Sequence, residues 1–129
     1  MKRLLLAFGL ILAVLAPVAA QTPAGPIGPV ATPTATGSLI AAARPAKLYS
    51  LVVTTGASAG FVMLFDQTTV PADGTVTPAY CFSIPATTTL SGPWIYPASF
   101  GTGIVAVFST TGCFSKTISA TAFISAQVQ

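Results

Sequence analysis

The sequence predicts an all-β fold: a single antiparallel β-sandwich or jelly roll of about seven or eight short strands. Three observations predict it. Beyond residue 37 the chain is rich in Thr, Val, Ile, Phe and Tyr, which are typical of strands. Gly or Pro interrupts these runs at roughly the 8–12-residue spacing of sandwiches and barrels. No stretch after the first twenty residues has the apolar period of a helix.

The first twenty residues have the features of an export signal. Lys2 and Arg3 provide a positive start, residues 4–15 are apolar, and Pro17 precedes small residues that end at Ala20. This arrangement favours cleavage after Ala20 and a secreted or periplasmic product. The alternative is an uncleaved apolar segment, although the run is short beside the roughly 20 residues that cross a bilayer.

Residues 21–37 are predicted to be a linker or docking arm. The segment holds four prolines and two glycines before Gly37 and carries no charge. Such a composition favours extended, polyproline-like backbone and a semi-rigid spacer. In a self-assembling surface or fibre subunit, an arm of this kind could complete a neighbour's sheet.

Residues 38–129 are predicted to form the β-sandwich domain. The expected strands are residues 38–43, 48–55, 61–66, 79–84, 87–90, 94–96, 103–109 and 117–127. Residues 103–109 are almost uniformly apolar, as expected for a central strand covered on both sides. Residues 117–127 alternate, with Ile118, Ala120, Ala122, Ile124 and Ala126 on one face, which predicts one buried face.

Turns are expected where Gly and Pro cluster between these strands. Residues 71–74 form one, because Pro71 presets φ and Gly74 can adopt a positive φ. Residues 110–112, which end in Gly112, form another.

Charged residues are too few to support catalysis. They make up 5% of the chain, there is no His, and the only acids are Asp66 and Asp73. General acid–base catalysis and metal ligation need groups that are missing, so we expect no enzyme activity, no cofactor and no metal site. We expect both carboxylates to be structural, with Asp73 in a turn and Asp66 capping residues 67–69.

The basic residues do not predict nucleic-acid binding. Beyond residue 20 they are Arg44, Lys47 and Lys116, too few to neutralise several phosphates. A near-neutral surface tends to associate, because net charge keeps molecules apart. The composition therefore favours a homo-oligomer; the alternative is a monomer solvated by its hydroxyl groups.

Cys81 and Cys113 form the candidate disulfide. Exported chains meet oxidising conditions, in which two cysteines often pair. A bridge within the chain, a bridge between subunits and two free thiols all remain open. A catalytic cysteine is not expected, because no His is present to activate it.

Trp94 and Tyr96 are the candidate contact with a foreign molecule. They alternate onto one face of an extended segment that lies between Pro93 and Pro97. Such a pair can stack on a sugar ring or anchor a protein interface. The alternative is that the two rings cover the core or pack between subunits.

Two stretches resemble small β-rich proteins of tailed phages and prophages. They are residues 48–74, which run from Leu-Tyr-Ser-Leu-Val-Val to Pro-Ala-Asp-Gly, and residues 100–125, which begin Phe-Gly-Thr-Gly-Ile-Val. The resemblance implies a virion-associated subunit, such as a head decoration or tail accessory protein. Such a subunit would be oligomeric, for example a trimer, and bound to a capsid or tail scaffold. A host-surface glycan is a further candidate partner. The alternative is a secreted or periplasmic binding module.

Overall fold

The structure, a computed structural model, describes residues 28–129, with the backbone alone for residues 93–96. The predicted leader and the start of the predicted linker lie outside the described residues. The strands are β1 (Gly28–Ala31), β2 (Ser38–Ala42), β3 (Ala46–Thr55), β4 (Gly60–Phe65), β5 (Gly74–Thr75), β6 (Tyr80–Ile84), β7 (Thr89–Phe100), β8 (Ile104–Ser109), β9 (Ser115–Lys116) and β10 (Ala122–Val128). No helix long and apolar enough to cross a membrane occurs in the described part of the chain.

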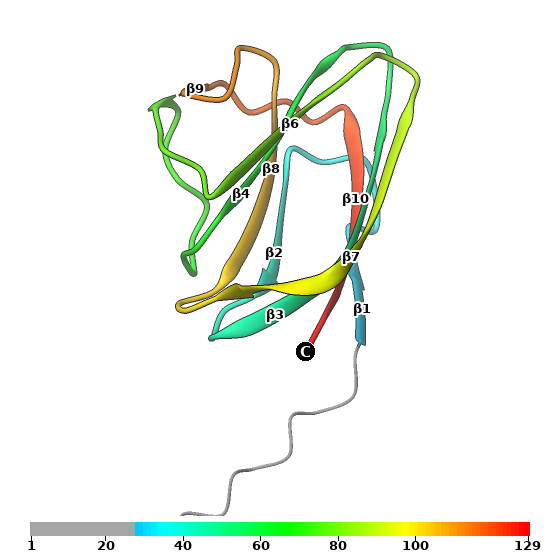
Figure 1. The fold of residues 1–129 in the computed structure, drawn as a ribbon. Helices are drawn as coiled ribbons and strands as arrows, with labels where there is room; N and C mark the ends of the chain where they lie inside the picture. Colours follow the sequence, from blue (N-terminus) through cyan, green and yellow to red (C-terminus); the bar gives the residue numbers. More distant parts are fainter. Residues whose placement is uncertain (1–27) are drawn as a thin grey trace, which may run out of the picture.

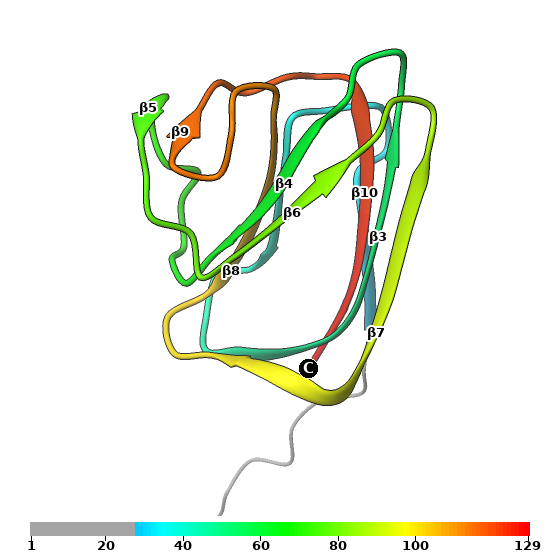
Figure 2. The same cartoon turned by 45° about the horizontal axis from the view of Figure 1, so that its top comes forward.

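Eight of these strands form two four-stranded antiparallel sheets, which confirms the predicted all-β class. One sheet has the order β1-β10-β3-β7 and the other β2-β8-β4-β6. The pairing is nested, because the first strand pairs with the last, the second with β8, the third with β7, and β4 with β6. In Figure 1 the two sheets face one another, and the turned view in Figure 2 shows the same arrangement.

One apolar cluster fills the space between the sheets. Leu48, Leu51 and Val53 of β3 meet Val62 and Leu64 of β4 there, and all five are at most 2% exposed. Burying side chains of this size stabilises the fold by about 1.5–3 kcal/mol each. The cluster includes side chains from both sheets, so it holds the two layers together.

Strand β8 is buried on both faces, as its uniformly apolar sequence predicts. Ile104, Ala106 and Phe108 point into the cluster between the sheets. Val105 and Val107 point the other way and pack with Met63 and Phe65 of β4 in a second, smaller cluster. This second cluster needs a cover of its own on the outer side of its sheet.

The two long connections next to β4 and β8 supply that cover. We call residues 66–79 and 110–121 together the capping lobe. Val70 and Val76 of the lobe pack on the second cluster. The short strands β5 and β9 pair with each other within the lobe, and Gly74 has a φ of 122°, as the predicted turn allows.

Two predicted strands, residues 87–90 and 94–96, prove to be one strand, β7. Gly92, Pro93 and Pro97 predict a break between two strands. A continuous strand forms instead, because β7 is the outer strand of its sheet. Proline is tolerated at a sheet edge, because one side of the strand needs no hydrogen-bond partner. The pairing with β3 shifts register between Leu48 and Ser50 and skips residues 94–97, which accommodates the Pro-rich stretch.

The predicted strand 117–127 is shorter than expected. Strand β10 starts at Ala122, and its inward residues up to Ala126 are buried as predicted. Ile118 is 41% exposed and Ala120 is also exposed, so the predicted buried face does not extend to them. The reason is that this part of the chain belongs to the capping lobe, where only an isolated bridge joins Ile118 to Ser109.

The described part of the predicted linker belongs to the sheets. Strand β1 pairs with β10, and the backbone N–H groups of Thr32 and Thr36 continue along β10 by donating to Ile124 and Ala122. The chain then crosses to the other sheet and enters β2. The sandwich therefore includes residues 28–37, ahead of the boundary predicted at residue 38.

Candidate interaction surface

The Cys81–Cys113 disulfide forms within the chain, one of the three alternatives left open by the sequence. The two Cα atoms are 5.7 Å apart, inside the usual range for a disulfide. Cys81 lies in β6, and Cys113 lies in the capping lobe. The bridge therefore ties the lobe to the edge of the sheet that it covers.

An ion pair closes the lobe near the disulfide. Lys116 Nζ donates to Asp73 Oδ1, and the same oxygen accepts the backbone N–H of Ile118 at 3.3 Å. The hydrogen bond from Lys116 is the main reason why the pKa of Asp73 is lowered. The Lys116 side chain is 2% exposed and that of Asp73 is 51% exposed, so the lobe presents the carboxylate to solvent and covers the ammonium.

Asp66 holds the turn between β7 and β8. Its Oδ2 accepts the backbone N–H of Gly101 at 2.9 Å, and its Oδ1 accepts those of Thr102 at 2.6 Å and Gly103 at 3.2 Å. These bonds, that from Gly101 first, lower the pKa of Asp66. The prediction that Asp66 caps residues 67–69 is wrong, because its partners lie far away in sequence; the Gln67 side chain bonds Thr69 O instead.

Phe114 is the most exposed large apolar residue of the described chain, at 73%. Its backbone is fixed from both sides. Cys113 before it is in the disulfide, and Ser115 after it pairs with Thr75. Phe114 O also accepts the N–H of Val76 at 3.1 Å. The aromatic ring thus projects from a rigid tip of the lobe.

A hollow of about 470 Å³ lies at one end of the sandwich, and we call it the terminal hollow. Its walls are the start of β1, the β2–β3 turn and the end of β10. Most of its lining side chains are small or apolar. They belong to Gly28, Val30, Ala41, Ala42, Ala43, Arg44, Ala46, Val128 and Gln129.

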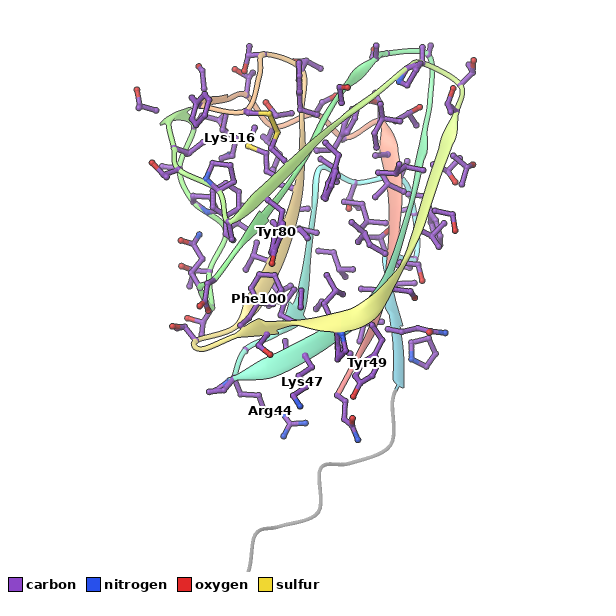
Figure 3. All side chains as sticks on the ribbon, in the orientation of Figure 1. Arg44, Lys47, Tyr49, Tyr80, Phe100 and Lys116 are labelled. Atoms are coloured by element: carbon purple, nitrogen blue, oxygen red, sulfur yellow. A yellow bond between two sulfur atoms is a disulfide. The ribbon has the colours of Figure 1, made fainter. Side chains whose placement is uncertain are left out.

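Gln129 forms a fixed part of the rim of this hollow. Its backbone exchanges two hydrogen bonds with Lys47, at 2.8 and 3.0 Å. Its Oε1 accepts the hydroxyl of Tyr49 at 2.6 Å. Arg44 and Lys47 are exposed at this end, where Figure 3 shows them close to Tyr49 and far from Lys116. Neither cation is in an ion pair within residues 28–129.

Trp94 and Tyr96 lie in the stretch of β7 for which the backbone alone is described. Their role as a ligand or interface contact therefore stays a prediction. Within residues 28–129 there is no group of three or more His, Cys, Asp or Glu side chains that could hold a metal ion.

Sequence reasoning missed Phe114 and the terminal hollow. One feature of the sequence could have indicated that Phe114 is exposed. It is an aromatic residue directly after a cysteine, in a turn that is otherwise rich in Thr, Gly and Ser. The run Ala41–Ala43 before Arg44 could have indicated the terminal hollow, because small side chains leave space. Neither observation shows that Phe114 and the hollow lie at opposite ends of the molecule.

Comparison with known proteins finds no match for this chain among protein-family models, curated proteins or solved structures.

Proposed function

We propose that this protein is a non-enzymatic structural subunit that assembles with copies of itself and with a scaffold, as a head decoration or tail accessory protein of a virion. The observation that carries the proposal is that three of the charged side chains in residues 28–129 hold the fold together. Asp66 holds a turn, and Asp73 and Lys116 close the capping lobe. In the described chain this leaves Arg44 and Lys47, charged side chains that form no ion pair within residues 28–129.

The strand order supports an assembling subunit. Nested pairing of eight strands, with the first beside the last, is the order of a jelly roll, and we infer that the domain is one. Jelly rolls are found in viral capsid and lectin domains. The resemblance of residues 48–74 and 100–125 to small phage proteins points to the virion among these settings.

The disulfide favours a second candidate, a secreted or periplasmic binding module. Disulfides persist in oxidising compartments, and the first twenty residues have the features of an export signal. In this candidate Trp94 and Tyr96 would contact a carbohydrate or the cell surface.

One fractionation experiment separates the two candidates. Particles, culture fluid and periplasm from a producing host would be separated by density, and the chain and its N-terminal residue identified by mass spectrometry. We expect the chain to sediment with particles that contain capsid or tail proteins. A chain that starts at Gln21 and stays in the soluble fractions would instead overturn the virion assignment and support the binding module.

A further inference from the structure

Two features of the described chain face outward. One is the Phe114 ring, which is largely exposed on a tip fixed by the disulfide and by the β5–β9 pairing. The other is the terminal hollow. An exposed aromatic side chain on a rigid support loses little conformational entropy when it binds, which is why such residues serve as interface anchors.

The terminal hollow has the size and the chemistry to take an aromatic side chain. A cavity of about 150 Å³ with apolar walls is enough to hold benzene, and this hollow measures about 470 Å³. Alanine and valine side chains supply apolar surface. Arg44 lies in the lining, where a guanidinium can cover the face of an aromatic ring.

The two features lie at opposite ends of the molecule. Phe114 directly precedes β9, which is at the far end from the start of β1 and the end of β10 in Figures 1 and 2. Figure 3 shows Lys116 of β9 and Arg44 of the hollow separated in the same way. A single copy therefore cannot place its own Phe114 in its own hollow.

We propose that Phe114 of one copy enters the terminal hollow of the next copy, so that the subunits join head to tail. This contact specifies which two surfaces meet in the self-assembly proposed above, and it rests on that proposal. Because it joins two different surfaces, an open assembly of any length keeps one free tip and one free hollow, and the contact produces an open filament or a closed ring.

The cations beside the hollow form no ion pair within residues 28–129, whereas the exposed member of the lobe's ion pair is a carboxylate. Arg44 and Lys47 are exposed beside the hollow. At the other end Lys116 is buried while Asp73 is half exposed, so the lobe presents a negative group. Asp73 Oδ2 accepts none of the hydrogen bonds found within residues 28–129, which leaves it open to a cation. Opposite charges at the rim favour this orientation of approach over tip to tip or hollow to hollow.

Two variants test the contact by complementation. Phe114→Ala removes the tip and keeps the hollow, whereas Ala43→Trp fills the hollow and keeps the tip. Ala43 is exposed and lies outside the strands, so the larger side chain does not disturb the core. Phe123→Ala is the matched control, because Phe123 is a 40% exposed aromatic on β10. Thermal unfolding of each variant would check that it folds.

The measurement is sedimentation velocity of the purified full chain over a range of concentrations. We expect wild type and Phe123→Ala to associate, and each of the two test variants to bind itself at least ~30-fold more weakly, as for loss of a central anchor residue. An equimolar mixture of the two variants should form dimers and nothing larger, because only one tip and one hollow remain.

The outcomes separate this contact from the function on which it rests. Association that survives Phe114→Ala, or a mixture that forms no dimer, would overturn the head-to-tail contact and leave self-assembly standing. Weaker self-association of Phe114→Ala together with unchanged self-association of Ala43→Trp would overturn the contact too. Phe114 would then bind another surface, and the hollow would be open to a different occupant, such as residues 21–27. A wild-type chain that is monomeric at every concentration would overturn both proposals.

Discussion

Asp66 shows how one residue can fix a connection between the two sheets. Its carboxylate collects three backbone N–H groups from the β7–β8 turn, a segment 35 or more positions further along the chain. A carboxylate satisfies several donors at once, which a hydroxyl cannot do as well. The sequence shows an Asp at the end of a strand, but its partners depend on how the chain folds.

We expect Asp66→Asn to reduce both stability at neutral pH and sensitivity to acid. The folded state lowers the pKa of Asp66, so the stabilisation is present above the unfolded pKa of ~3.9 and is lost as pH falls through the lower folded value. Thermal unfolding at pH 7, 4 and 2.5 measures this. The variant should lose less stability between pH 7 and pH 2.5 than wild type does, and an unchanged pH dependence would contradict the assigned role. Some dependence should remain, because the pKa of Asp73 is lowered too.

We expect Gly103→Ala to destabilise the same turn by about 1–3 kcal/mol, the usual cost of overpacking. A Cβ at this position would lie 2.7 Å from the carbonyl oxygens of Ala42 and Gln67, and backbone cannot move aside as a side chain can. Gly101→Ala is the control, since its nearest neighbour is Asp66 Oδ2 at an ordinary 3.6 Å. Chemical denaturation of both variants measures the difference. Equal losses would mean that the close approach at residue 103 is not the cause.

At the scale of the strands, the residue types predict most of the fold. The predicted segments 38–43, 48–55, 61–66, 79–84 and 103–109 each match one strand to within two residues at either end. The misses occur where position in the sheet decides the outcome. Gly and Pro interrupt a central strand, but the edge strand β7 tolerates them.

The candidate sites were less predictable than the strands. The two cysteines indicated a candidate disulfide but left a bridge within the chain, a bridge between subunits and free thiols open, and the structure shows the bridge within the chain. The capping lobe was not predictable, since β5 and β9 have two residues each and carry no alternating pattern. The Lys116–Asp73 pair joins segments 43 positions apart, and sequence spacing does not indicate such a contact.

We expect the Cys81→Ala, Cys113→Ala double variant to lose about 3–4 kcal/mol of unfolding free energy, from the chain entropy of a loop closed across 32 positions. Urea denaturation with and without a reducing agent measures it. Reduction should lower the stability of wild type to that of the variant and leave the variant unchanged. A wild type that is insensitive to reduction after denaturation would contradict the bridge.

For the whole molecule, the distribution of charge matters more than its amount. Within the described residues the charged side chains gather at two ends. Arg44 and Lys47 flank the terminal hollow, and Asp66 binds the turn whose Gly103 packs against Ala42 near them. Asp73 and Lys116 are at the other end. A molecule charged at its ends, with few charges between them, has a preferred axis for association.

The nested strand order has a consequence for the time at which the protein can fold. Strand β10 lies between β1 and β3, so it forms two of the three junctions in its sheet. Residues 122–128 are therefore needed before β1 and β3 can be joined, although both are synthesised much earlier. Contacts between such distant segments carry a large loop-closure entropy and form slowly. The sheet that contains β10 is thus completed late, because β1 and β3 are joined only once residues 122–128 have been made.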